Sequence, residues 1–199
     1  MDAWEVFAII GTVSFSMQGA LIAMEKKYDL FAVYFLGLIT AFGGGALQNV
    51  LIGGSDYQLW SQQKLFLFAI ISITIIVAFP EKTLKAEVFW ANILDAFGII
   101  AFAIQGSINA INLSLPASAI VVSAIITATG GGIIRDLMVQ RRPILLGENV
   151  YGLWIFMIGL IMAFRGQQAM NYRYLLFIVF SALRILSFIY DWRIPYRNY

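Results

Sequence analysis

The chain has 199 residues and a net charge of +2, and it is 61% hydrophobic but only 12% charged. A water-soluble domain of this size would carry about twice that charged fraction, so the composition excludes an ordinary soluble enzyme. Because the chain has neither cysteine nor histidine, disulfides, thiolate or imidazole metal sites and histidine-based catalytic triads are also excluded. We therefore predict a protein that is not an enzyme, requires no cofactor and has no structural metal site.

Long apolar segments follow one another along the whole chain, separated by charges and turn residues. In chain order they span about 4–24, 31–52, 65–79, 89–109, 117–138, 147–164 and 174–192. About 20 apolar residues are enough to cross the ~30 Å hydrocarbon layer of a membrane. The sequence therefore predicts an all-α polytopic membrane protein, with seven transmembrane helices in a single transmembrane domain over 1–199.

The distribution of lysine and arginine predicts the orientation. The connecting segments on the side of the N-terminus carry Lys64, Arg165 and Arg173, whereas the opposite side carries Lys26, Lys27, Lys82, Lys85, Arg141, Arg142, Arg193 and Arg197. Cytoplasmic loops are enriched in these residues, so we expect an external N-terminus and a cytoplasmic C-terminus. No single basic patch is formed, which argues against nucleic-acid binding.

The chain resembles itself at an offset of 87 residues. At this offset, 12 of the 40 positions from 11 to 50 are identical, and the matches include Gly11 with Gly98, Phe15 with Phe102, Gln18 with Gln105 and Gly19 with Gly106. Similar composition alone explains matching alanines, but not five of six glycines falling on glycines. We predict a duplication of about 4–80 as about 91–167, with a further helix at about 174–192. Each copy holds three crossings, an odd number, so the second copy is inverted in the membrane, as in many transport proteins.

Each copy contains three consecutive glycines in its second apolar segment. These are Gly43, Gly44 and Gly45 in the first copy and Gly130, Gly131 and Gly132 in the second. Glycine is unfavourable in a helix interior by about 1 kcal/mol relative to alanine, so one expectation is a bent or broken helix whose free carbonyls line a wet cavity. The alternative is close packing of two helices. For two triplets at equivalent places we favour the break.

Polar residues within the apolar segments are candidates for an ion pathway. Arg135 and Asp136 follow the second triplet, and they predict either a local ion pair or a direct role in selecting or gating ions. Asp95 shares a helix face with Gln105, Asn109 and Asn112, while Ser14 and Gln18 share another. These faces predict either pore lining or hydrogen bonds between helices. For Arg184 we expect a structural role, at the cytoplasmic interface or paired with Asp191.

The segment from Gly130 to Leu137, followed by Pro143, resembles the signature of prokaryotic relatives of the trimeric intracellular cation (TRIC) channels, a family also described as a glycine transporter domain. The first triplet is similar to the family's first copy of the motif. The resemblance implies two inverted three-helix repeats plus a seventh helix, a homotrimer in the plasma membrane of a prokaryote, and passive conduction of potassium. It also implies a pore lined by the second and fifth helices, which carry the two glycine triplets, Arg135 and Asp136.

The sequence departs from this pattern at Gln48 and Asn49, which occupy the positions equivalent to Arg135 and Asp136. The first half-site is therefore neutral. Our leading hypothesis is a channel for potassium or sodium in which Asp136 attracts the cation and Arg135 limits its residence. A secondary transporter of a small solute such as glycine, and a purely structural membrane scaffold, are the alternatives.

Overall fold

A computed structural model describes residues 3–53, 62–79, 87–146 and 150–192, and these residues contain helices but no strand. The α-helices are α1 (Ala3–Glu25), α2 (Leu30–Ile52), α4 (Gln63–Ala78), α6 (Glu87–Asn112), α7 (Ala117–Met138), α8 (Tyr151–Arg165) and α9 (Arg173–Ile189), with short 3₁₀ turns η1 (Ile144–Leu146) and η2 (Gly166–Tyr172). The all-α prediction is confirmed for this part of the chain.

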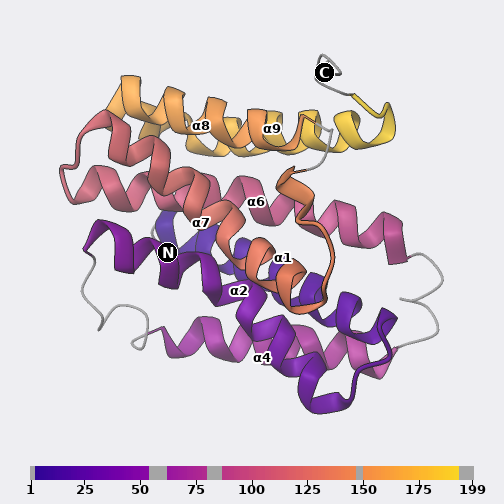
Figure 1. Cartoon of the computed structure of the whole chain (residues 1–199). Coiled ribbons are helices and arrows are strands. Elements are labelled where there is room, and N and C mark those ends of the chain that lie inside the picture. Colours follow the sequence, from indigo (N-terminus) through magenta and orange to yellow (C-terminus); the bar gives the residue numbers. More distant parts are fainter. Residues whose placement is uncertain (1–2, 54–61, 80–86, 147–149, 193–199) are drawn as a thin grey trace.

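The helices form a layered bundle (Figure 1), with α8 and α9 at one edge, α4 at the other and α1, α6 and α7 between them. The most extensive contacts join α1 to α6, α2 to α7, α1 to α2 and α6 to α7. Where α1 crosses α6, the Phe15 and Phe102 rings meet edge to face, with their centroids 5.1 Å apart. Each ring lies over a glycine of the opposite helix, Phe102 over Gly11 and Phe15 over Gly98, at places where a Cβ would overlap the ring.

The helices α2 and α7 run without interruption through their glycine triplets, so the expected helix break is not found. The triplets instead face each other across the crossing of the two helices. A Cβ built on Gly44 would overlap the carbonyl oxygen of Thr127, and one built on Gly131 would overlap the carbonyl oxygen of Thr40. The structure therefore supports the packing alternative, in which the absence of side chains lets two backbones touch.

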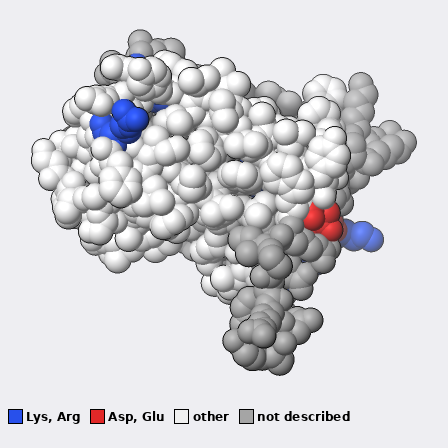
Figure 2. Space-filling model, turned by 90° about the horizontal axis from the view of Figure 1, so that it is seen from above, with Lys and Arg blue, Asp and Glu red and all other residues white. Residues whose placement is uncertain are grey.

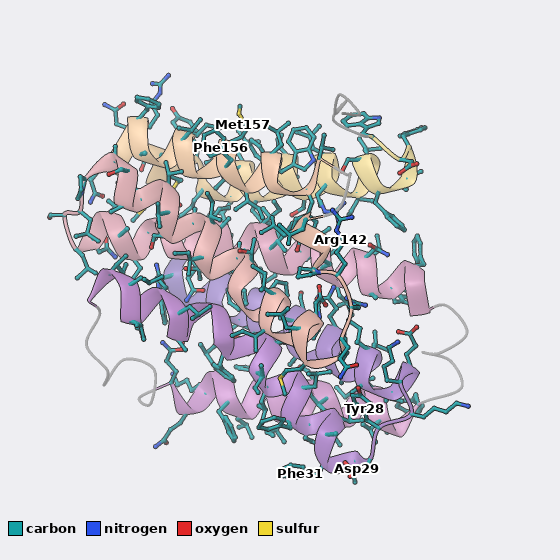
Figure 3. All side chains as sticks on the ribbon, in the orientation of Figure 1. Tyr28, Asp29, Phe31, Arg142, Phe156 and Met157 are labelled. Atoms are coloured by element: carbon teal, nitrogen blue, oxygen red, sulfur yellow. The ribbon has the colours of Figure 1, made fainter. Side chains whose placement is uncertain are left out.

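The surface of the bundle is apolar along its length. Figure 2, which looks down on the α8 and α9 edge, shows an uncharged face with charges only near its ends. Large side chains such as Phe31, Phe156 and Met157 project outward (Figure 3). Such a surface is typical of a protein whose surroundings are lipid.

Within the part of the chain that the structure describes, five helical stretches can cross a membrane by length and composition: Trp4–Glu25, Leu30–Ile52, Phe89–Asn112, Ala117–Met138 and the stretch Tyr151–Ile189, which includes α8, η2 and α9. The remaining α4 is apolar but shorter. The chain is thus a helical membrane protein, as its composition predicts. Of the residues used to predict orientation, Lys82, Lys85, Arg193 and Arg197 lie outside the described residues.

Candidate functional site

A network of buried polar side chains connects five helices near the C-terminal end of α1. Asp95 of α6 is 1% exposed. Its Oδ1 accepts hydrogen bonds from Gln18 Nε2 at 2.9 Å and from the Tyr151 hydroxyl at 3.2 Å. Its Oδ2 lies 3.5 Å from Nη2 of Arg184. Because an ionised group is costly inside a membrane, these partners explain how Asp95 is accommodated.

Arg184 is 2% exposed and lies with its guanidinium carbon 4.7 Å from the centre of the Tyr151 ring. It therefore pairs with Asp95 and lies against the Tyr151 ring inside the bundle, so the expected position at the membrane interface is wrong. The expectation failed because helix periodicity places Arg184 on a face of α9 without revealing which helix covers that face. The structural role expected for this residue fits the observed contacts.

Arg135 extends the network from α7. Its Nη1 donates to Gln18 Oε1 at 2.5 Å, and its Nε donates to Asp136 Oδ1 at 2.9 Å. The same carboxylate oxygen accepts from Arg141 Nε at 2.8 Å. Asp136 thus lies between two arginines while both Arg135 and Asp136 are only 1% exposed. The local ion pair considered from the sequence is present, and it forms part of a larger cluster.

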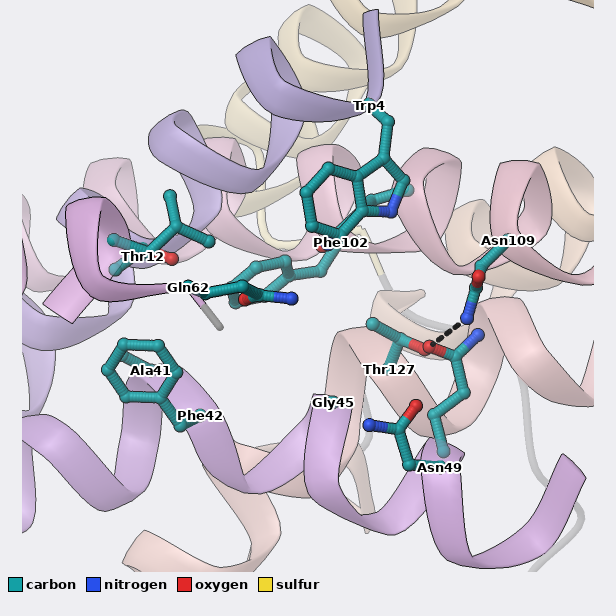
Figure 4. Close-up of a pocket in the computed structure, with 13 residues that line it drawn as sticks. Trp4, Thr12, Ala41, Phe42, Gly45, Asn49, Gln62, Phe102, Asn109 and Thr127 are labelled. Carbon is teal, nitrogen blue, oxygen red and sulfur yellow. Dashed lines mark hydrogen bonds between the residues drawn. The ribbon is translucent and has the colours of Figure 1, made fainter. Parts of the chain in front are cut away.

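On the other side of the glycine crossing lies a cavity of about 40 Å³, which we call the amide cavity (Figure 4). Its polar lining consists of two threonines, Thr12 and Thr127, and five amide side chains, those of Gln48, Asn49, Gln62, Gln105 and Asn109. None of its described lining residues is charged. Gly45, Trp4, Phe42 and Phe102 also contribute to its wall.

Within the amide cavity, Gln48 is held by other helices. Its Nε2 donates to the Gly106 carbonyl oxygen at 3.0 Å and to the Ser123 hydroxyl, and its Oε1 accepts from Asn109 at 3.4 Å. In contrast, Oε1 of Gln105 is buried with no hydrogen-bond partner among the described residues. A buried acceptor without a partner is costly, so this oxygen marks a place where a donor or a cation would be stabilised.

Two further hollows lie on either side of the amide cavity and the glycine crossing. The amide cavity shares Trp4, Gln62, Leu65 and Asn109 with a wide opening of about 860 Å³, the vestibule, which also borders Glu5, Lys64 and Asn112. Beyond the glycine crossing lies an arginine cavity of only about 10 Å³, lined by Thr129, Gly132, Ile133, Arg135, Asp136, Pro143, Leu145 and Tyr151. A water molecule needs roughly 10–15 Å³ of such space, so this second cavity is nearly filled by protein.

Most of the residues predicted from the sequence lie at these cavities, at the glycine crossing or in the buried network, but they do not form one continuous site. Gly45, Gln48, Asn49 and Gln105 border the amide cavity, whereas Gly132, Arg135 and Asp136 border the arginine cavity. Gly43, Gly44, Gly130 and Gly131 form the crossing between the two cavities. Gln18 and Asp95 belong to the buried network, and Ser14 is buried without lining any of the three hollows.

Sequence reasoning missed several residues of the network and the cavities. Tyr151 and Arg141 contact the two buried carboxylates, and Trp4 and Gln62 line both the amide cavity and the vestibule. Each lies close to a helix end, where polar and aromatic residues are also expected at the membrane interface. Only their position relative to the other helices distinguishes them.

Comparison with known families identifies the fold. The profile of a family described as glycine transporter matches the chain twice, over residues 5–81 and 92–168. The chain belongs to this family, the family of the prokaryotic TRIC channels. Two solved TRIC structures have similar folds. One, of a prokaryotic TRIC channel in 0.5 M KCl, has a TM-score of 0.87 at 28% identity, covering 96% of this chain and 98% of the other.

The second solved structure, described under the basis for conductance through TRIC cation channels, has a TM-score of 0.84 at 27% identity, covering 98% of this chain and 97% of that one. Among sequence relatives, the UPF0126 membrane protein YvgT of Bacillus subtilis is 43% identical over 197 residues, 99% of this chain and 98% of the relative. A UPF0126 membrane protein of Deinococcus radiodurans is 33% identical over 135 residues, 68% of this chain and 62% of that protein. This TRIC family member therefore has the fold of a cation channel.

Proposed function

We propose that this TRIC family member is a passive channel for monovalent cations, with potassium as its main ion. The observation that carries the proposal is the wide vestibule and, next to it, the uncharged amide cavity beside the α2 and α7 glycine crossing, which shares four lining residues with it. Amide and hydroxyl oxygens can replace part of the hydration shell of a cation. The similarity to solved TRIC cation channels supports the same activity.

We further propose that the pathway is built from two inverted repeats of three transmembrane helices, followed by a seventh helix. The two family matches begin 87 residues apart, at 5 and at 92. Helix α2 begins at Leu30 and α7 at Ala117, again 87 residues apart. In this arrangement, the repeats at about 4–80 and 91–167 both line the vestibule and the amide cavity, the second repeat lines the arginine cavity, and α9 is the seventh helix.

Arg135 is proposed to restrict the far half of the pathway. Its side chain nearly fills the arginine cavity and places positive charge along the route of a cation. Asp136 accepts hydrogen bonds from Arg135 and Arg141, which favours a role in holding these arginines over the attraction of ions predicted from the sequence. The restriction would therefore arise from a fixed arginine rather than from free main-chain carbonyls.

The transporter alternative is less favoured by this geometry. Binding the carboxylate of glycine at the triplets would use the N-termini of broken half-helices. Because α2 and α7 are continuous there, no helix N-terminus is available at the crossing. The amide cavity also offers no cationic side chain among its described lining residues.

Recording from purified protein in planar bilayers tests the proposal. We expect discrete unitary currents carried by potassium, with a reversal potential under potassium and sodium gradients that reports the selectivity. Bilayers without currents, together with saturable glycine uptake into vesicles, would replace the channel by the carrier.

Changing Arg135 to Gln gives the second repeat the residue that the first repeat has at Gln48. We expect a larger potassium conductance, because the substitution removes a fixed charge and enlarges the arginine cavity. The exposed Arg142→Gln is the matched control and should leave the conductance unchanged. An unchanged current in Arg135→Gln would remove Arg135 from the ion pathway.

The remaining parts of the proposal concern the cellular setting. We propose a homotrimer with one pore in each subunit, embedded in the lipid of a prokaryotic plasma membrane, with the N-terminus outside and the C-terminus in the cytoplasm. The similarity to TRIC channels supports the assembly, and the apolar surface supports the lipid environment. The excess of Lys and Arg on the side opposite the N-terminus supports the orientation.

A further inference from the structure

The two cavities differ at residues that lie 87 positions apart. The guanidinium of Arg135, in the second repeat, donates to Oε1 of Gln18, in the first. The corresponding pair is Gln48, in the first repeat, and Gln105, in the second, but Gln48 bonds to Gly106 and Ser123 instead. Gln105 Oε1 consequently lacks the partner that its counterpart has.

The cavity that contains the unpaired Gln105 oxygen is also the larger of the two. The amide cavity has about 40 Å³, against about 10 Å³ in the arginine cavity. At roughly 10–15 Å³ for a water molecule, the first cavity has room for a small ligand and the second does not. The amide cavity lies next to the vestibule, with which it shares four lining residues, so the vestibule is the adjacent side from which a ligand would enter.

The chemistry of the lining indicates what that ligand is. The free acceptor of Gln105 and the side chains of Asn49 and Gln62 offer carbonyl oxygens, while Trp4 and Phe102 offer aromatic rings. Planar guanidinium groups donate to such oxygens and stack on aromatic rings. The position equivalent to this cavity already holds a guanidinium, that of Arg135.

We propose that the amide cavity binds a small guanidinium-type cation, which enters through the vestibule and occupies the place that Arg135 fills in the other repeat. The amide cavity is also part of the route that we propose for potassium. Only the expected effect of guanidinium on the current rests on that proposed function. A bound guanidinium would obstruct potassium from the vestibule side. Binding itself requires only the cavity and the free Gln105 oxygen.

The experiment measures binding of radiolabelled guanidinium to the purified full chain by equilibrium dialysis, with urea as the neutral compound of matching shape. We expect saturable binding of guanidinium, one per chain, that urea does not displace. Equal competition by urea would show a site for any planar polar molecule and would overturn the proposal.

Substitutions at Gln105 separate a lost site from a misfolded protein. Gln105→Leu should weaken guanidinium binding about tenfold or more, because it removes the acceptor. Gln105→Glu should strengthen binding by a similar factor, since a carboxylate bonds guanidinium more strongly than an amide does. Misfolding cannot produce tighter binding. The exposed Gln167→Leu and Gln167→Glu serve as matched controls and should bind as the unchanged protein does.

Gln48→Arg places a tethered guanidinium at the equivalent position and should abolish binding of the free ion, whereas Gln167→Arg should not. If Gln48→Arg or both Gln105 variants bind guanidinium as the original chain does, the assigned site is wrong. If the protein conducts potassium in bilayers but binds no guanidinium in dialysis, this inference is overturned and the proposed channel stands. Guanidinium binding in a protein that carries no current would uphold the site and reject the channel.

Discussion

At the scale of single residues, the buried charges are accommodated by specific partners. Asp95 is bonded by Gln18 and Tyr151 and paired with Arg184. Breaking a buried pair by removing one partner usually costs about 3–5 kcal/mol, because the other charge is left alone. This cost is far above that of an exposed ion pair, such as Glu5 with Lys64.

Asp95→Asn is therefore predicted to destabilise the folded protein strongly, by about 3 kcal/mol or more, because Arg184 loses its counter-charge. Thermal unfolding in detergent measures the effect. The exposed Asp29→Asn is the matched control, since Asn caps a helix as well as Asp does. The double variant Asp95→Leu with Arg184→Leu should lose less stability than the sum of its single variants. Additive losses would show that the two residues do not interact.

At the scale of helices, the backbones of α2 and α7 can approach each other closely only because glycines lie where they cross. A Cβ on Gly131 has no space against the α2 backbone, whereas a Cβ on Gly132 would lie 3.6 Å from Arg135 Nη2, an ordinary contact. Both positions are within the same continuous helix. Gly131 is thus required for the close approach of the two helices, whereas Gly132 is not.

Gly131→Ala is predicted to lower the unfolding temperature, because overpacking typically costs about 1–3 kcal/mol and each kcal/mol corresponds to about 2–4 °C in a protein of this size. Gly132→Ala should leave the temperature unchanged or raise it, since alanine favours helix. Differential scanning fluorimetry in detergent compares the two. Equal behaviour of the two variants would contradict the close contact at Gly131.

Helix α9 buries polar side chains and exposes apolar ones, which is the reverse of a surface helix in a soluble protein. Its inward face carries Ser181, Arg184 and Ser187, while Leu175, Ile178 and Ile189 are exposed. In water this arrangement would be unfavourable, because it exposes apolar and buries polar groups. In lipid it is favourable, which explains how a helix with a central arginine belongs in the bundle.

At the scale of the whole molecule, the vestibule and the arginine cavity lie on opposite sides of the glycine crossing. The vestibule lies at the N-terminal end of α1, and the arginine cavity lies at the C-terminal end of α7. The proposed orientation therefore directs the vestibule outward and the restriction toward the cytoplasm.

Orientation can be tested directly because the chain has no cysteine of its own. A cysteine at Lys64 is predicted to react with a membrane-impermeant maleimide on intact cells, since Lys64 is 84% exposed on the N-terminal side. A cysteine at the exposed Lys26, on the opposite side, should react only after permeabilisation. The reverse pattern of labelling would invert the proposed topology.

The sequence by itself determined the environment and the helical class, and it singled out most of the polar residues that line the cavities or form the buried network, because a membrane requires long apolar segments and makes every intramembrane charge conspicuous. The offset of 87 residues also indicated which helices correspond. Only the tertiary structure decided that the triplets pack helices instead of breaking them, that Arg184 pairs with Asp95, and that Gln48 bonds to Gly106 and Ser123. These outcomes depend on which face of one helix meets which face of another, and periodicity along a single helix does not contain that information.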